Sequence, residues 1–179
     1  ALIDGWTGAG DPEIAGLTAD SRAVKPGFLF AALPGAKADG RAFIAKAIEA
    51  GAAAVIAPQG TAAAIPVVAN DNPRRAFALA AARFYGRQPE IVAAITGTNG
   101  KTSIAAFVRQ IFAACGRKAA SMGTVGIVSP SGERTLSHTT PDPVVVHQEL
   151  ARPADEGVTH LALEASSHGL DQHRLDGVR

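Results

Sequence analysis

The residues best suited to chemistry form a short polar turn between an apolar run and an amphipathic segment. The apolar run, Ile91–Ile95, contains β-branched residues and is typical of a buried strand. The turn that follows, residues 96–103, reads TGTNGKTS. Its glycines let the backbone approach an anion, and the free N–H groups at a helix start favour negative charge. The pattern therefore predicts a strand, a phosphate-binding turn and a helix, with a nucleoside triphosphate as the ligand.

This turn departs from the commonest phosphate-binding loop. The pattern G-x-x-x-x-G-K-[ST] would place a glycine at position 95, where isoleucine stands, so the spacing is Gly97-x-x-Gly100-Lys101-Thr102. Short glycine–lysine turns also arise by chance. The alternative interpretation is an ordinary turn between a strand and a helix, with an exposed lysine.

Glu164 closes a second apolar run, His160–Glu164. Ligands of parallel α/β sheets lie at the carboxyl ends of the strands, so we expect Glu164 at the same edge as the turn. A carboxylate and a threonine hydroxyl there could hold Mg²⁺, and Thr102 and Glu164 are the predicted metal ligands. The alternative is a glutamate that faces solvent, as most glutamates do.

Other polar segments are ambiguous from the residues alone. Residues 138–142 (HTTPD) precede a predicted helix, where they could bind an anion or where Asp142 could simply cap the helix. Residues 172–174 (QHR) are typical of a solvated face. Residues 166–168 (SSH) do not predict a serine hydrolase, because the G-x-S-x-G elbow is absent.

Composition narrows the class of protein. The 179 residues are 47% hydrophobic and 18% charged, which favours a packed core over disorder. The net charge is +1 without a basic stripe, so nucleic acid is not an expected partner. No apolar run is long enough to span a membrane, so a membrane is not expected either. The single cysteine, Cys115, excludes an intrachain disulfide and fits a reducing cytoplasm.

The pattern of elements predicts an α/β fold in two segments that divide near residue 88. In residues 1–88 we expect strands at 28–33, 53–57 and 67–68, and helices at 43–50 and 73–85. In residues 89–179 we expect strands at 91–95, 119–122 and 160–164, and helices at 101–114 and 142–155. Strands that alternate with helices predict a parallel sheet covered on both faces. The second segment is expected to be the first part of a P-loop-type parallel-sheet domain.

Several motifs together resemble those of the Mur ligases, in particular the members that add the third residue of the peptide. They occur in order along nearly the whole chain at residues 18–22 (TADSR), 25–30 (KPGFLF), 39–41 (DGR), 97–102 (GTNGKT), 122–126 (MGTVG), 139–141 (TTP) and 164–174 (EASSHGLDQHR). The phosphate turn is shared with folylpolyglutamate synthases, whereas residues 164–174 are more specific to the third-residue enzymes.

The resemblance implies an ATP-dependent ligase of peptidoglycan synthesis. Residues 1–88 would be the N-terminal UDP-substrate-binding domain and residues 89–179 a partial central ATP-binding domain. The domain that binds the incoming amino acid would lie outside this chain, as would the family's carbamylated lysine and second metal-binding histidine. The chain is therefore expected to be an N-terminal fragment without ligase activity of its own.

The implied reaction uses ATP and Mg²⁺ to phosphorylate the D-glutamyl side chain of UDP-N-acetylmuramoyl-L-alanyl-D-glutamate. An amine of a diamino acid then attacks the acyl phosphate. Lys101 and Glu164 would be catalytic, and Thr102 and Glu164 would hold the metal. The implied ATP-binding residues are Gly97, Thr98, Asn99, Gly100, Lys101, Thr102 and Ser103. The implied substrate-binding residues are Ala19, Ser21, His138, Thr139, Thr140, Ser166, Gln172 and Arg174.

Two residues and one short segment differ from the family's usual pattern. His138 stands where the family often has asparagine, so it could replace only one amide hydrogen bond. Ala36 stands where many members have histidine, so no side-chain contact to the nucleotide is expected there. Residues 71–74 (DNPR) spell the family's diaminopimelate-selecting signature. That signature belongs to the absent third domain, so here we expect Asn72 to cap a helix that begins at Pro73.

Two other functions remain open from the sequence. The chain could act only as a uridine-nucleotide-binding module. It could also belong to a ligase of the folylpolyglutamate synthase type. That class should lack a UDP-binding first domain, whereas in this chain about 88 residues precede the phosphate turn.

Overall fold

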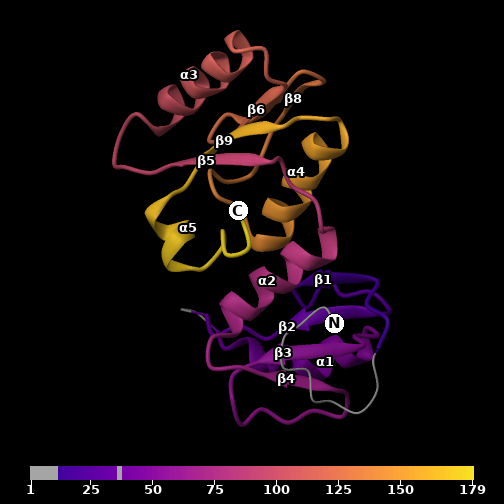
Figure 1. Cartoon of the computed structure of the whole chain (residues 1–179). Helices are drawn as coiled ribbons and strands as arrows, with labels where there is room; N and C mark the ends of the chain where they lie inside the picture. Colours follow the sequence, from indigo (N-terminus) through magenta and orange to yellow (C-terminus); the bar gives the residue numbers. More distant parts are fainter. Residues whose placement is uncertain (1–11, 36–37) are drawn as a thin grey trace. The chain divides into compact units, whose positions relative to one another are not determined.

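Two separate sheets organise the chain. The computed structural model describes residues 12–35 and 38–179, so Ala36 lies outside the described residues. The chain divides into compact units at Ala1–Phe84 and Tyr85–Arg179. Each unit has its own sheet and its own helices (Figure 1). No helix within the described ranges is both long and apolar enough to cross a membrane.

The first unit contains a parallel sheet in the order β1-β2-β3-β4. Its strands are β1 (Gly16–Thr18), β2 (Phe28–Ala31), β3 (Ala54–Ala57) and β4 (Val67–Ala69). β1 was not among the predicted strands. With only three residues, β1 is too short to show an alternating pattern, and its pairing with β2 defines it.

The helices of this unit begin at side-chain caps. Asp39 accepts a hydrogen bond from the Arg41 amide at the start of η1 (Gly40–Phe43), which continues into α1 (Ile44–Glu49). Asn72 Oδ1 accepts from the Arg75 amide at 3.0 Å at the start of α2 (Pro73–Tyr85). The expected capping role of Asn72 is therefore confirmed.

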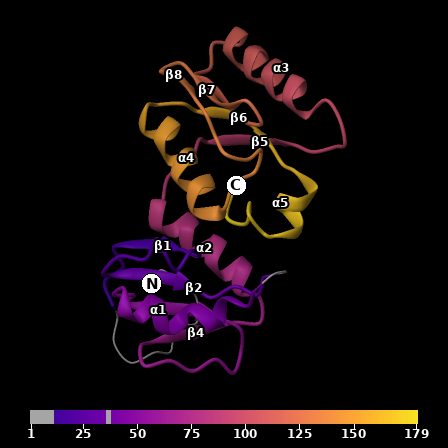
Figure 2. The same cartoon turned by 180° about the vertical axis from the view of Figure 1, so that it is seen from behind.

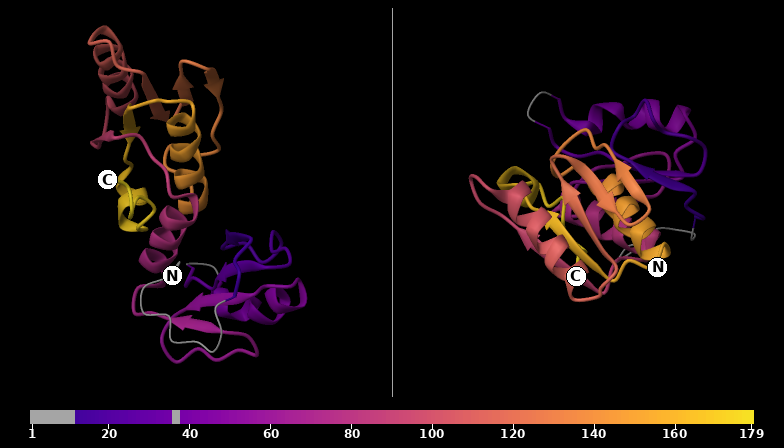
Figure 3. Two further views of the ribbon diagram at one scale, coloured as in Figure 1. Left: turned by 45° about the vertical axis from the view of Figure 1, so that its right-hand side comes forward. Right: turned by 90° about the horizontal axis from the view of Figure 1, so that it is seen from above.

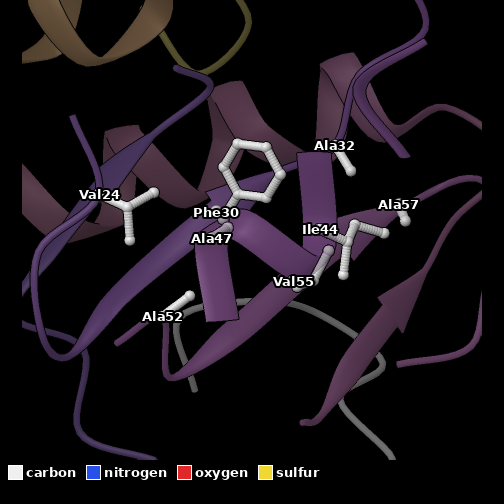
Figure 4. Packing of buried hydrophobic residues seen from close by; sticks show 8 residues of the cluster. All are labelled: Val24, Phe30, Ala32, Ile44, Ala47, Ala52, Val55 and Ala57. Atoms are coloured by element: carbon white, nitrogen blue, oxygen red, sulfur yellow. The ribbon is translucent and has the colours of Figure 1, made fainter. Parts of the chain in front are cut away.

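One hydrophobic core cluster of the first unit lies between the sheet and α1 (Figure 4). Successive residues of a strand point to opposite faces, so Phe30 and Ala32 of the β2 segment share a face with Val55 and Ala57 of β3. Ile44 and Ala47 of α1 belong to the same cluster as these side chains. Phe30, which is only 1% exposed, is the largest fully buried side chain of this cluster.

The second unit contains a mixed sheet in the order β5-β9-β6-β7-β8. Its strands are β5 (Ile91–Ile95), β6 (Ala119–Gly123), β7 (Gly126–Ser129), β8 (Gly132–Arg134) and β9 (His160–Glu164). The pairings of β9 with β5 and β6 are parallel, which confirms that part of the prediction. The antiparallel strands β7 and β8 were not predicted, because their short, polar and glycine-interrupted segments lack strand periodicity.

Helices cover both faces of this sheet, as expected. They are α3 (Lys101–Ala114), α4 (Pro143–Asp155) and the short α5 (Ser167–Asp171), which was not predicted. Leu161 and Leu163 of β9 pack in a cluster with Val146 and Leu150 of α4. The ring of His160, on the other face of β9, meets that of Phe112 of α3 edge to face at 4.8 Å. Figures 2 and 3 show α3 and α4 on opposite sides of the strands.

The prediction that β5 is buried was wrong. β5 is the edge strand of the sheet and pairs with β9 alone among the described strands. Ile91 is 49% exposed, and Phe107 and Ile111 of the neighbouring helix α3 are 61% and 60% exposed. An apolar run thus correctly indicated a strand, but the run alone could not show how many neighbours the strand has.

Candidate functional site

The turn between β5 and α3 has the backbone geometry that an anion site needs. Gly97 and Gly100 have φ angles of 140° and 81°, in a region that strongly favours glycine. Gly100 is the N-cap of α3 and offers no capping side chain, and the first α-helical bond runs from the Ile104 amide to Gly100 O at 2.9 Å. The earlier amides of the helix have no intrahelical acceptor and remain available to an anion.

Lys101 lies over this turn. Its ammonium donates to Gly97 O at 2.7 Å and to Thr98 O at 3.4 Å. Thr98, Asn99 and Gly100 are exposed, so the turn is open to solvent. The structure thus gathers a cation, free amide groups and a helix N-terminus at one exposed turn.

Glu164 is buried beside this turn, at the end of β9. Its register partner on β5 is Ile95, the last residue before the turn, so the prediction that the two segments share a sheet edge is confirmed. Glu164 is only 1% exposed, and the interpretation as a solvated glutamate is therefore wrong. Its Oε2 accepts from Thr102 Oγ1 at 3.0 Å and from Thr124 Oγ1 at 3.1 Å, and its Oε1 accepts from the Thr124 amide at 2.9 Å.

The alternation of β9 explains the direction of this carboxylate. Leu161 and Leu163 face α4, so Glu164 points to the opposite face, where the first turn of α3 lies. Gly123, at the end of β6, leaves room for it: a Cβ at position 123 would lie 2.1 Å from Glu164 Oε1. No other residue type fits at position 123 without displacing the carboxylate.

Thr139 and Thr140 connect Glu164 to the loop that precedes α4. Thr140 Oγ1 donates to Glu164 O at 3.0 Å and accepts from the Ser166 amide at 3.1 Å. Thr139 Oγ1 lies 2.9 Å from Thr124 Oγ1. Asp142 caps α4 by accepting from the amides of the helix start, so capping and threonine contacts coexist in this loop.

Arg174 and Ser166 also reach this network. Arg174 Nη1 donates to Thr140 O at 2.8 Å, so it is not simply part of a solvated face. Ser166 Oγ accepts from the Gly169 amide at 3.0 Å and caps α5. The bonds of the Ser166 amide and of Arg174 Nη1 to Thr140 place both residues beside the threonine pair.

The other predicted site residues are described by their local contacts. His138 is exposed, and its Nδ1 lies 3.0 Å from Ser137 Oγ. Gln172 follows α5, and its backbone amide donates to His168 O at 3.0 Å. Ala19 and Ser21 belong to the first unit, in the turn after β1. Ser103, which was predicted to bind ATP, is exposed in the first turn of α3.

The turn that carries Ala19 and Ser21 is fixed by an ion pair. Asp20 Oδ1 accepts from the Arg22 amide at 2.9 Å, and Asp20 Oδ2 lies 2.7 Å from Arg22 Nη2. The hydrogen bonds from the Arg22 side chain and amide lower the pKa of Asp20 to about 2. The same pairing of Asp39 with Arg41 lowers the pKa of Asp39.

Thr124 is the member of the site to which the sequence assigned no role, although it lies within one of the motifs, residues 122–126 (MGTVG). It directly follows Gly123 at the end of β6, the other strand that pairs with β9. The signal was available, because residues 122–126 (MGTVG) end a predicted strand at the ligand-binding edge of the sheet.

The donor set suits a hard divalent cation. The Thr102 hydroxyl and the Glu164 carboxylate are oxygen groups whose Oγ1 and Oε2 atoms lie 3.0 Å apart. The described part of the chain contains no group of three or more histidine, cysteine or acidic side chains that could hold a metal. Mg²⁺ commonly takes one or two protein oxygens and completes its shell with water and phosphate oxygens, which fits this pair.

Two family models match the chain. The model described as Mur ligase family, catalytic domain, matches residues 13–98. The model described as Mur ligase middle domain matches residues 95–179. Together they extend over almost the whole sequence.

Curated relatives agree with these models. The UDP-N-acetylmuramoyl-L-alanyl-D-glutamate–2,6-diaminopimelate ligase of Brucella melitensis is 59% identical over 174 residues, which are 96% of this chain and 36% of that protein. The ligase of the same name from Rhizobium meliloti is 61% identical over 168 residues, with 93% of this chain and 35% of that protein covered. The chain thus spans about a third of the length of these relatives.

Solved structures show the same architecture. A structure of a UDP-N-acetylmuramoyl-L-alanyl-D-glutamate–2,6-diaminopimelate ligase has a TM-score of 0.79 at 33% identity and covers 92% of this chain and 34% of its own. The MurF ligase from Thermotoga maritima in complex with ADP has a TM-score of 0.60 at 21% identity, with coverage of 95% and 36%, and shows the fold alone. On the two family models and these relatives, the chain belongs to the Mur ligase family.

Proposed function

We propose that this chain supplies the nucleotide-binding and phosphate-binding parts of an ATP-dependent ligase of peptidoglycan synthesis. The ligase joins 2,6-diaminopimelate to UDP-N-acetylmuramoyl-L-alanyl-D-glutamate, as the names of the relatives suggest. The observation that carries the proposal is the contact between Thr102 and buried Glu164 beside the exposed glycine turn. A reducing cytoplasm, where ATP is available, is the compartment that fits this activity.

Phosphoryl transfer depends on positioning and charge neutralisation more than on a nucleophile from the protein. The amides at the start of α3 and the Lys101 ammonium would hold the ATP phosphates, and Lys101 would exchange its bonds to Gly97 O and Thr98 O for phosphate oxygens. Thr102 and Glu164 would hold Mg²⁺, which neutralises phosphate charge when bound. The boundary near residue 88 between a UDP-binding and an ATP-binding domain belongs to the same proposal.

The second half of the reaction needs a positioned acceptor. The side-chain carboxylate of D-glutamate takes the γ-phosphoryl group, ADP leaves, and an amine of the diamino acid attacks the acyl carbon and displaces phosphate. Arg174 uses one of its N–H groups on Thr140 O, which leaves others for a substrate carboxylate or phosphate. We assign Thr139, Thr140, Ser166, His138 and Gln172 to the muramoyl-peptide.

The uridine end of the substrate is assigned to the first unit. Ala19 and Ser21 lie in the turn that Asp20 and Arg22 fix, and this turn follows the edge strand β1. A fixed turn holds its backbone groups in one orientation, which suits recognition of a uracil ring or a ribose.

Titration calorimetry on the chain tests this proposal. A non-hydrolysable ATP analogue with Mg²⁺ and, separately, UDP-N-acetylmuramoyl-L-alanyl-D-glutamate are expected to bind saturably. Lys101→Met should weaken binding of the ATP analogue, and Ser21→Trp should weaken binding of the UDP compound. Neither variant should change the binding of the other ligand. Binding of the uridine nucleotide alone would support the simple binding module. Binding of folates in place of the UDP compound would favour a ligase of the folylpolyglutamate synthase type.

A further inference from the structure

A continuous chain of hydroxyl groups runs through Glu164. Thr102 Oγ1 and Thr124 Oγ1 both donate to Glu164 Oε2, at 3.0 and 3.1 Å. Thr124 Oγ1 also lies 2.9 Å from Thr139 Oγ1. The chain therefore joins the phosphate turn, the end of β6, the end of β9 and the loop before α4.

The number of available protons sets the direction of these bonds. A carboxylate only accepts hydrogen bonds, and a threonine hydroxyl has a single proton to donate. Thr124 uses that proton on Glu164 Oε2, so in its contact with Thr139 it must be the acceptor. Thr139 then donates to Thr124 and has only lone pairs left for a ligand.

We propose that Thr124 is a positioning residue of this site. It holds the carboxylate of Glu164 in place and orients the hydroxyl of Thr139, so that Thr139 meets a ligand as an acceptor only. The statement that these residues face substrate and metal rests on the function proposed above.

The geometry supports positioning rather than a role in folding. Thr124 is exposed, yet both its amide and its hydroxyl are directed to the same buried carboxylate. Gly123 beside it removes the Cβ that would otherwise collide with Glu164. Hydrogen bonds to a charged group are stronger than those between neutral groups, so Thr124 has a larger effect on Glu164 than an ordinary surface threonine would have.

The proposal also specifies the ligand chemistry at Thr139. An acceptor-only hydroxyl is complementary to an N–H or O–H group, such as the amide of a peptide, and not to a carboxylate or phosphate oxygen. Thr139 would thereby fix the peptide part of the substrate, while the N–H groups of Arg174 that do not bond Thr140 O can take an anionic group.

The test compares Thr124→Val, which removes only the hydroxyl, with Thr124→Ser, which keeps it. Three-bond NMR couplings to the methyl carbon of Thr139 report its χ1 rotamer without any ligand. We expect one rotamer in the wild type and in Thr124→Ser, and rotamer averaging in Thr124→Val. Thr124→Ala repeats the removal with a smaller side chain. Thr135→Val, at an exposed threonine of the same loop, is the matched control and should leave the Thr139 couplings unchanged.

A second measurement uses the Mg²⁺ complex of a non-hydrolysable ATP analogue. Thr124→Val should weaken its binding about tenfold, the loss typical of one hydrogen bond to a charged group, and Thr124→Ser should restore it. An unchanged Thr139 rotamer in Thr124→Val, or binding within about twofold of the wild type, overturns the proposal. If the wild-type chain binds no nucleotide, the proposed function fails, and the Thr139 couplings still decide whether Thr124 positions its neighbours.

Discussion

At the residue scale, the site depends on how a carboxylate is accommodated in the protein interior. Burying a charged group is costly unless hydrogen bonds compensate for lost water, and Glu164 receives such bonds from Thr102 and Thr124. Gly123 provides the space and the threonines provide the donors. A purely structural position would be filled more readily by an apolar residue, so the arrangement favours a role for the carboxylate in binding.

The space at Gly123 gives a direct prediction. Gly123→Ala places a methyl group 2.1 Å from the present position of Glu164 Oε1, so the carboxylate must move. We expect loss of Mg²⁺–nucleotide binding and a destabilisation of about 1–3 kcal/mol from overpacking. Calorimetry and chemical denaturation measure the two effects.

The control for this prediction is a double mutant. Glu164→Asp withdraws the carboxylate by one methylene, so Gly123→Ala combined with Glu164→Asp should cost less stability than the sum of the single changes. Additive effects would mean that the methyl group and the carboxylate do not collide.

The turn at Asp20 gives a prediction about pH. Because hydrogen bonds from Arg22 lower the pKa of Asp20 from 3.8 to about 2, this interaction is complete above pH 3.8 and is lost as the pH falls through about 2. Both side chains are largely exposed, so the effect on overall stability should be small. In Arg22→Gln, carboxyl-carbon NMR should find Asp20 titrating nearer 3.8, with Asp39 as the internal control. A titration midpoint that does not move would show that Arg22 is not the cause.

At the element scale, the residue pattern predicted most helices and strands but not all the pairings between strands. The apolar run of β9 and the caps at Asn72 and Asp142 are local signals, and the structure follows them. The exposure of β5 and the hairpin of β7 and β8 depend on pairing between distant segments, which local periodicity does not encode. The position of Thr124 after a predicted strand was visible in the sequence, but its contact with Glu164 also depends on β6 lying beside β9.

The two helices that flank the sheet should respond differently to truncation of their apolar side chains. Leu150 of α4 is fully buried, so Leu150→Ala should cost about 2–5 kcal/mol of unfolding free energy. Phe107 of α3 is 61% exposed, so Phe107→Ala should change it by less than about 0.5 kcal/mol. Urea denaturation of the chain compares them, and similar losses for the two variants would contradict this description of the core.

His147 links α4 to the C-terminal segment and predicts acid sensitivity. Its Nε2 lies 3.0 Å from Asp176 O, and burial lowers the pKa of His147 below 6.5. As the pH falls, His147 is therefore protonated in the unfolded chain before it is protonated in the folded chain. The contribution of neutral His147 to the free energy of unfolding is complete above pH 6.5 and declines as the pH falls below that value. Chemical denaturation at several pH values below 6.5 should show that the free energy of unfolding declines less steeply with falling pH in His147→Gln than in the wild type. An identical pH dependence in wild type and variant would exclude His147 as the cause.

At the scale of the whole molecule, the chain consists of two compact units, each with a sheet and a core. Uridine-site residues are assigned to one unit and phosphate-site residues to the other. The chain spans about a third of the length of the ligases it matches, so we expect ligand binding without ligation. Phosphate release that requires both ATP and the UDP-muramoyl dipeptide, measured on this chain, would contradict that expectation.

The central claim is that the turn at residues 97–103 binds a triphosphate with Glu164 as its partner at the metal. The most direct test is backbone NMR of the chain during titration with a non-hydrolysable ATP analogue, with and without Mg²⁺. We predict saturable amide shifts that are largest at residues 97–103 and extend to Glu164 only when Mg²⁺ is present, and that Glu164→Gln removes the Mg²⁺-dependent part. Shifts centred elsewhere while residues 97–103 stay unchanged, or no saturable shift at all, would contradict the assignment.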